Sequence, residues 1–360
     1  MNKELNLFKN ITVSNFKDVS FPYKLNFNLT NKCNSKCLTC NIWQIKSSNE
    51  LKTDEIEKFF KKSNKFSWID LTGGEIFLRN DAAEVAEIIL RENKNLYHLH
   101  IPTNVVKKEL TVKNIKKIIS FKPKKFTVTF SLDGPEKVHD YVRGVEGNWR
   151  SVMDAYAELK SYQNNRFEIF FGFTLSKFNF GKFEETVESV RTVFPDVSYK
   201  KFHMNLAHSS ENYYQNSGVD LGIKNNYDAL IKEFEFFRER KKELFNPINF
   251  LENIYLELLK DYLKTGVTPI DCKALSSSVY LDPYGNAHPC SIWDKKIGNI
   301  RDFDYDLTAM LNQNIVPEIK RDILNKNCPN CWTPCEAYQS VFGNLRQAGK
   351  KILFKRNNGK

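Results

Sequence analysis

No apolar run in the sequence approaches the roughly 18 residues that a membrane-spanning helix needs. Low-complexity tracts are also absent, and the start, Met-Asn-Lys-Glu-Leu-Asn, lacks the charged-then-apolar layout of a secretory signal. The content of 41% hydrophobic and 27% charged residues is ordinary for a globular protein. These features exclude disordered and fibrous classes. They predict a cytoplasmic protein without a membrane partner.

A basic stripe interleaved with aromatic residues is missing as well, although the formal net charge is +11. Such a charge permits binding to a polyanion through phosphate neutralisation. The lysines are scattered, however, along what the pattern predicts to be solvated helix faces. We therefore expect no nucleic-acid partner, and the charge only slightly favours an acidic or phosphorylated substrate.

Cysteine is absent from the long central part of the chain and occurs in two groups near its ends. A cytoplasmic chain seldom uses cysteines in disulfides, so tight cysteine spacing indicates a metal, either iron–sulfur or zinc. The two groups are Cys33, Cys37 and Cys40, and then Cys272, Cys290, Cys328, Cys331 and Cys335.

Between these groups, strand-like and helix-like segments alternate. Hydrophobic patterning predicts strands at 24–29, 66–71, 96–101, 126–132, 167–175 and 197–204. It predicts helices at 51–62, 81–91, 111–119, 149–162, 182–193, 227–241 and 249–264. Such units pair in parallel through right-handed crossovers, as a doubly wound sheet or an incomplete barrel. In both folds ligands bind at the carboxyl ends of the strands, where the first cysteine group lies.

The first cysteine group has the spacing C-x3-C-x2-C. Three thiolates on a short loop can hold three irons of a [4Fe–4S] cluster and leave the fourth iron without a protein ligand. An open iron is a place to bind and activate a small molecule. Zinc is the alternative, but structural zinc normally takes four ligands, and no nearby histidine completes the set.

Further motifs follow at successive strand ends. Gly73-Gly74-Glu75 follows the second predicted strand, Thr103-Asn104 follows the third, and Ser131 with Arg143 follows the fourth. With these motifs, the chain resembles radical S-adenosylmethionine (SAM) enzymes over about residues 22–340. The resemblance implies an α/β fold, a partial (β/α)6 barrel.

The resemblance also implies a mechanism and its residues. Cys33, Cys37 and Cys40 would hold the [4Fe–4S] cluster whose open iron binds SAM. An electron from a donor such as flavodoxin or ferredoxin would cleave SAM to a 5′-deoxyadenosyl radical, which abstracts hydrogen from the substrate. A carboxylate suits the SAM ammonium group, and a guanidinium suits its carboxylate. The implied SAM contacts are Gly73, Gly74, Glu75, Asn104, Ser131 and Arg143.

The second cysteine group surrounds a predicted hairpin, with the turn Asp282-Pro283-Tyr284-Gly285 between residues 277–281 and 286–290. The pattern C-x12-G-x4-C followed by C-x2-C-x3-C resembles the SPASM/Twitch extension, which holds auxiliary [4Fe–4S] clusters. Five cysteines suffice for one cluster, as in the shorter Twitch type. A zinc ribbon is the alternative. The match implies the ligands Cys272, Cys290, Cys328 and Cys331, with Cys335 as a possible substitute.

These patterns divide the chain into five expected parts. They are an N-terminal extension at 1–21, the radical SAM core barrel at 22–210, a helical connection at 211–268, a Twitch-like domain of a β-hairpin plus helix at 269–345, and a loose basic tail at 346–360.

The expected function is a radical SAM oxidoreductase or related enzyme that acts on a peptide or a small polar metabolite. One alternative, a molybdenum-cofactor-type cyclase, typically ends in Gly-Gly, whereas this sequence ends Asn-Asn-Gly-Lys. Another is an amino-sugar alcohol dehydrogenase. A non-enzymatic iron–sulfur or zinc-binding protein is the alternative from a different class. It would not need Gly73, Glu75 and Arg143 beside an open cluster.

Overall fold

The computed structural model describes residues 2–223, 226–241 and 247–358. One sheet carries nine strands in the order β6-β5-β4-β3-β2-β1-β7-β8-β9, and β1 to β6 pair in parallel. The strands are β1 Lys24–Thr30, β2 Trp68–Gly73, β3 His98–Thr103, β4 Lys125–Ser131, β5 Phe167–Leu175, β6 Phe202–Leu206, β7 Ser278–Leu281, β8 Asn286–His288 and β9 Gly298–Asn299.

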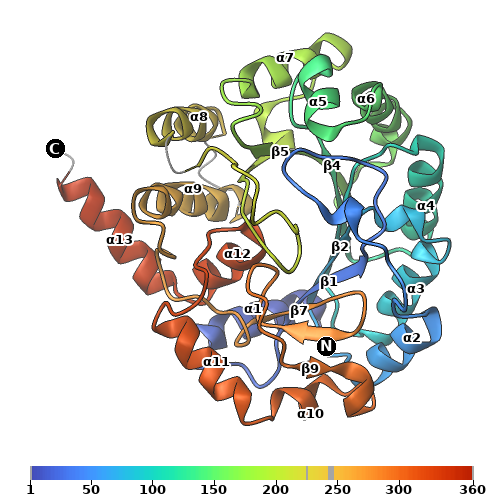
Figure 1. Ribbon diagram of the computed structural model, residues 1–360, viewed down its shortest axis with the longest axis vertical. Coiled ribbons are helices and arrows are strands. Elements are labelled where there is room, and N and C mark those ends of the chain that lie inside the picture. The colour runs from blue at the N-terminus through green and yellow to red at the C-terminus, as the bar shows by residue number, and fades with distance from the viewer. Residues whose placement is uncertain (1, 224–225, 242–246, 359–360) are drawn as a thin grey trace.

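Helices alternate with the first six strands and cover the outside of the curved sheet (Figure 1). This confirms the predicted partial barrel. The helices are α1 Lys3–Ser14, α2 Thr53–Lys62, α3 Ala82–Glu92, α4 Lys108–Ser120, α5 Glu136–Arg143, α6 Asn148–Leu159, α7 Phe183–Val193, α8 Tyr227–Arg240, α9 Pro247–Thr265, α10 Leu307–Leu311, α11 Ile315–Leu324, α12 Pro334–Phe342 and α13 Leu345–Asn358.

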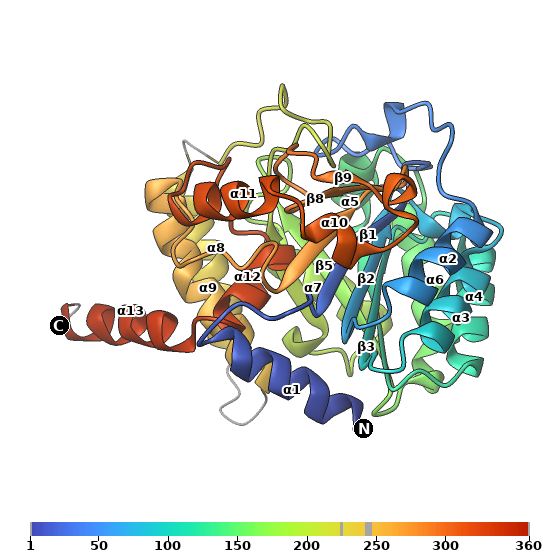
Figure 2. The ribbon, with the colours of Figure 1, turned by 90° about the horizontal axis from the view of Figure 1, so that it is seen from below.

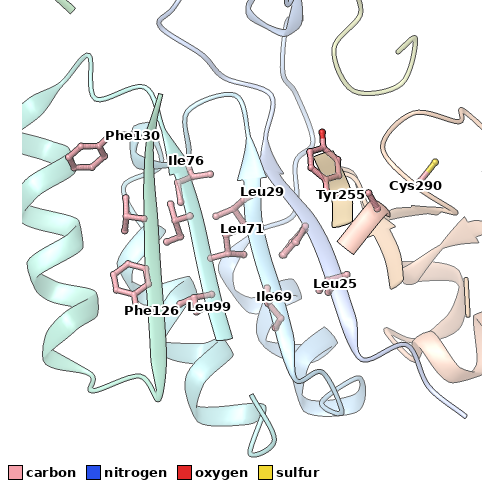
Figure 3. Close-up of a cluster of buried hydrophobic side chains, with 14 of the residues drawn as sticks. Leu25, Leu29, Ile69, Leu71, Ile76, Leu99, Phe126, Phe130, Tyr255 and Cys290 are labelled. Atoms are coloured by element: carbon pink, nitrogen blue, oxygen red, sulfur yellow. The ribbon is translucent and has the colours of Figure 1, made fainter. Parts of the chain in front are cut away.

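Alternation along the strands separates an apolar layer from a polar one. Leu25, Phe27 and Leu29 of β1 are buried, and the ring of Phe27 lies 6.2 Å from that of Phe60 on α2. Figure 3 shows this apolar layer along β1 to β4. The intervening residues, such as Lys24 of β1, point to the other side of the sheet because side chains alternate along a strand.

Some predicted boundaries were wrong. The sixth strand begins only at Phe202, because Tyr199–Lys201 form a 3-10 turn ahead of it. Helix α5 was missed, since its eight residues are too few for a clear hydrophobic period. It ends at Gly144, whose φ of 63° is the left-handed conformation that commonly ends helices.

The hairpin near the C-terminus is part of the barrel sheet. Strands β7 and β8 are antiparallel, as the turn motif predicted, and β7 also pairs in parallel with β1. Lys24 of β1 is opposite Ser278 of β7 in this register. The pairing brings the second cysteine group alongside the barrel.

A helix lies near each end of the described part of the chain. Helix α1 lies in the N-terminal extension, and α13 projects away from the body (Figure 2). Where the sequence predicted a loose basic tail at 346–360, the structure has the helix α13 over Leu345–Asn358. Its lysine, arginine and leucine residues have good helix propensity, which supports the helix despite Gly349. No helix in residues 2–223, 226–241 and 247–358 combines the length and the apolar character of a membrane span.

Candidate functional site

The first cysteine group lies on the loop that leaves the carboxyl end of β1. Cys33, Cys37 and Cys40 are all half-buried there. Burial raises the pKa of the Cys33 thiol to about 11 and that of Cys40 to about 12. Free thiols at these positions are therefore protonated at neutral pH, and ligation to a metal cluster would release their protons.

Two of the predicted SAM residues contact this cysteine loop. Asn104, just after β3, donates hydrogen bonds from Nδ2 to Asn34 Oδ1 and Ser35 Oγ, both at 2.9 Å, and its Nδ2 is 3.8 Å from Cys33 Sγ. Arg143 Nη1, at the end of α5, is 3.7 Å from Cys37 Sγ. Donors and positive charge near the sulfur atoms favour the thiolate form that iron requires.

The Gly73-Gly74 turn at the end of β2 packs on the backbone that leads into the cysteine loop. A Cβ on Gly73 would lie 2.4 Å from the carbonyl oxygen of Thr30, and one on Gly74 would lie 2.2 Å from that of Lys32. Gly73 also has a φ of +139°, which other residues rarely adopt. Glycine is therefore required at both positions, because the backbone of this turn lies directly against the backbone of residues 30–32.

Glu75, which completes this motif, links the ends of β2 and β3. It is 2% exposed and accepts hydrogen bonds from Thr103 Oγ1 at 2.9 Å, from Asn104 N at 2.7 Å and from Phe77 N at 3.2 Å. Burial raises the pKa of Glu75 to about 7 despite these donors. The carboxyl group therefore positions Asn104, which in turn holds the cysteine loop.

Arg143 forms an ion pair within the same edge of the barrel. Its Nε lies 2.7 Å from Oδ2 of Asp133, and the other carboxylate oxygen accepts a hydrogen bond from Thr174 N at 2.8 Å. Burial raises the pKa of Asp133, and Arg143 opposes that shift. Ser131, the last residue of β4, is half-buried beside Gly172 of β5. All the predicted SAM residues thus lie at the carboxyl ends of β2, β3 and β4 or just beyond.

Several buried polar atoms near this edge have no hydrogen-bond partner among the described residues. They include Oδ1 of Asn28, which faces Gly73, and Nδ2 of Asn34, next to Cys33. Unpaired buried polar groups are unfavourable unless a ligand or water satisfies them. An acceptor and a donor beside three thiols fit a cluster with a polar, charged ligand such as SAM.

Burial raises the pKa values of several cysteines in the second group. For the Cys331 thiol burial is the largest cause, and the charges of Cys272, Glu336 and Cys328 raise its pKa further. Burial also raises the pKa of Cys290, followed by the effects of Cys331, Glu336 and Cys272.

Cys335 has different neighbours. Burial raises its pKa to about 12, and the charged groups that act on it are Lys24, Asp70 and Glu336. Its carbonyl oxygen accepts a hydrogen bond from Lys24 Nζ at 2.8 Å. This places Cys335, in the first turn of α12, beside the polar side of the barrel.

Within the part of the chain that the structure describes, no three His, Cys, Asp or Glu side chains are arranged to hold a single metal ion.

A loop at residues 208–216, after β6, connects the two cysteine groups, and sequence reasoning missed it. Toward the first group, Asn216 Nδ2 donates to the carbonyl oxygen of Thr39 at 2.8 Å, and Asn41 N donates to that of Tyr214 at 2.8 Å. The hydroxyl of Tyr213 donates to Gly73 O at 3.0 Å and accepts from Gly73 N at 3.2 Å.

Toward the second group, the same loop contacts residues beside two of its cysteines. Ser210 Oγ donates to the carbonyl oxygen of Ser291 at 2.7 Å. Trp332 N donates to Nε2 of His208 at 3.1 Å. The only sequence signal for this loop was its position after the sixth strand, at the edge where ligands bind.

The inner side of the barrel is polar, which sequence reasoning also missed. Lys24 is buried, with Nζ 3.0 Å from Asp70 Oδ2. Nδ1 of His100 lies 3.2 Å from Asp70 Oδ1, and its Nε2 is 2.9 Å from Thr129 Oγ1. The sequence of β1 did contain a signal for this polar side. Parallel strands buried on both faces are usually apolar throughout, whereas polar and apolar residues alternate along β1.

Comparisons with known proteins agree with this architecture. The radical SAM superfamily model matches residues 27–190, and the SPASM iron–sulfur cluster-binding domain matches residues 272–332. The chain is 25% identical over 342 residues to the antilisterial bacteriocin subtilosin biosynthesis protein AlbA of Bacillus subtilis (strain 168), covering 89% of this chain and 68% of AlbA.

Solved structures share the fold at lower identity. The structure of anSMEcpe with bound AdoMet and Cp18Cys peptide has a TM-score of 0.57 at 18% identity, covering 94% of this chain and 100% of that one. Streptococcus suis SuiB bound to the precursor peptide SuiA has a TM-score of 0.58 at 17% identity, covering 88% and 70%. The chain is therefore a radical SAM enzyme with a C-terminal SPASM iron–sulfur cluster-binding domain.

Proposed function

We propose that this enzyme uses SAM to modify a peptide by radical chemistry. The structural observation that carries the proposal is the placement of both cysteine groups beside one polar barrel interior, linked by the 208–216 loop. The relatives support the peptide substrate. AlbA is named for bacteriocin biosynthesis, and anSMEcpe and SuiB have each been solved with a peptide bound.

In this proposal Cys33, Cys37 and Cys40 hold a [4Fe–4S] cluster with one open iron. Once bound and reduced, the cluster and SAM together supply a 5′-deoxyadenosyl radical. The protein binds and orients SAM and keeps water from the barrel interior. The residues proposed to contact SAM are Gly73, Gly74, Glu75, Asn104, Ser131 and Arg143. A small electron-transfer protein such as flavodoxin or ferredoxin would supply the electron.

The second group would hold one auxiliary [4Fe–4S] cluster without an open iron. Its proposed ligands are Cys272, Cys290, Cys328 and Cys331, because these four cysteines lie within the segment that the SPASM model matches, residues 272–332. Cys335, whose carbonyl oxygen accepts a hydrogen bond from Lys24 of the barrel, is the possible substitute ligand.

The test begins with anaerobically reconstituted protein and dithionite, which should convert SAM to 5′-deoxyadenosine and methionine. Changing Cys33, Cys37 and Cys40 together to Ala should abolish this product while the auxiliary iron remains, and that iron is the control for folding. Mass spectrometry of a short peptide encoded beside the gene then tests the substrate. Turnover in the triple variant, or an amino sugar modified in place of the peptide, would contradict the proposal.

A further inference from the structure

Val105, which follows the Thr103-Asn104 turn after β3, has a left-handed backbone with a φ of 59°. A β-branched residue rarely adopts this conformation, because its Cβ crowds the following carbonyl oxygen. The side chain of Val105 is fully buried. Strain of this kind persists only where neighbouring groups hold the backbone in place, and it is concentrated beside functional sites.

A side chain from a different strand–helix unit holds this turn. Asn148 is the first residue of α6 and is 1% exposed, and its Nδ2 donates to the carbonyl oxygen of Asn104 at 2.9 Å. Within the turn, Val106 N donates to Oδ1 of Asn104 at 3.0 Å. Asn104 is therefore fixed at its carbonyl oxygen as well as through the side chain that contacts the cysteine loop.

His139 on α5 sets the orientation of the Asn148 carboxamide. Nδ1 of its buried ring accepts a hydrogen bond from Asp133 N at 3.0 Å, and its Nε2 lies 2.9 Å from Asn148 Oδ1. Burial, and then the charge of Arg143, lower the pKa of His139 to about 3, so the ring is neutral. Because Nδ1 is an acceptor, the single ring hydrogen is on Nε2 and is donated to Asn148. A flipped carboxamide would face donor with donor and acceptor with acceptor, so only this orientation fits.

Asp140 holds the start of α6 around Asn148. Its two carboxylate oxygens accept hydrogen bonds from Gly147 N at 2.7 Å and from Trp149 N at 2.9 Å, on either side of Asn148. The junction of α5 and α6 therefore presents the Asn148 side chain to the end of β3 in a fixed position. Neither His139 nor Asn148 is among the proposed ligands of a cluster or of SAM.

We propose that His139 and Asn148 are positioning residues for the cluster of the first cysteine group, a proposal that rests on the proposed function. They hold the left-handed turn at Val105 and so keep the Asn104 side chain on the cysteine loop. Asn104 Nδ2 is 3.8 Å from Cys33 Sγ. A donor beside a cluster sulfur stabilises the more negative, reduced cluster, and its loss lowers the reduction potential.

The first test compares reconstituted wild type with Asn148→Ala. The affinity for SAM in calorimetry should fall about tenfold, because a left-handed non-glycine residue is disfavoured by about that factor when nothing holds it. The midpoint potential of the first group's cluster, from a redox titration followed by EPR, should shift to a lower value. The matched control is Asn93→Ala. Asn93 is a buried carboxamide that donates to Ile89 O at 3.1 Å at the opposite end of the barrel, and its loss should change neither value.

Two further comparisons separate positioning from general damage to the fold. In a Val105→Gly background the left-handed turn is no longer strained, so adding Asn148→Ala should weaken SAM binding by about twofold or less. His139→Gln keeps an N–H donor for Asn148, whereas His139→Leu keeps only an apolar side chain of similar size. His139→Gln should therefore bind SAM more tightly than His139→Leu.

Hydrogen exchange at Asn104 N, which donates to Glu75, needs neither SAM nor a cluster and should be faster in Asn148→Ala than in wild type. A wild type without a cluster on the first group would contradict the proposed function, and this exchange would still decide the inference. Unchanged exchange in Asn148→Ala, an equal loss of SAM affinity in the Val105→Gly background, the same losses in Asn93→Ala, or equal binding by the two His139 variants would each overturn it.

Discussion

Replacing Arg143 by Gln should strongly destabilise the fold, because it leaves the carboxylate of Asp133 buried without its partner. Arg143 Nε and Asp133 Oδ2 are 2.7 Å apart, and their side chains are 14% and 3% exposed. Removing one member of a buried pair typically costs about 3–5 kcal/mol, because the other charge stays uncompensated. The loss should reach the cysteine loop, since Arg143 Nη1 is 3.7 Å from Cys37 Sγ.

The effect should depend on pH. Burial already raises the pKa of Asp133 above its ordinary value of 3.8, and the loss of Arg143 raises it further. A carboxyl group whose pKa is higher in the folded than in the unfolded chain lowers stability as pH rises, because the unfolded state ionises more easily. The free energy of unfolding of Arg143→Gln should therefore fall further below wild type at pH 8 than at pH 5.

Urea unfolding of reconstituted protein, followed by tryptophan fluorescence, provides the assay. Adding Asp133→Asn to Arg143→Gln should recover most of the lost stability, because it removes the isolated charge. Arg150→Gln is the matched control, since Arg150 pairs with Glu136 at 2.6 Å on the surface, where such pairs contribute up to about 1 kcal/mol. If Arg143→Gln costs no more than Arg150→Gln, or if Asp133→Asn rescues nothing, the reasoning is refuted.

Three further substitutions test the cofactor sites. Glu75→Ala should weaken SAM binding by roughly 10- to 100-fold in calorimetry, because a hydrogen bond to a charged group is worth about 1.5–3 kcal/mol. If the affinity for SAM is unchanged, Glu75 does not contact SAM, and its role is limited to the hydrogen bonds with Thr103 and Asn104. Wild type should contain about eight irons in two four-iron clusters, and Cys331→Ala should fall towards about four. Cys335→Ala should keep about eight, and the reverse pattern would show that the ligand set is wrong.

The sequence by itself determined the class of protein and the edge of the fold that carries its chemistry. The spacing of cysteines and the period of hydrophobic residues are local properties of the sequence. They can therefore be recognised without knowing which segments are in contact in the folded protein. Parallel strands joined by right-handed crossovers bring their carboxyl ends to one edge. For that reason Asn104 and Arg143, far from the cysteines in sequence, were expected near them, and the structure places them 3.8 Å from Cys33 Sγ and 3.7 Å from Cys37 Sγ.

Only the tertiary structure decided how the second half of the chain meets the first. The parallel pairing of β1 with β7 joins segments such as Asn28 and Tyr280, 252 positions apart. The contact of Tyr213 with Gly73, and the hydrogen bond from Lys24 to the carbonyl oxygen of Cys335, depend on the same assembly. The sequence around each of these residues does not predict these contacts. A contact between distant segments depends on which buried faces pack together in the folded protein.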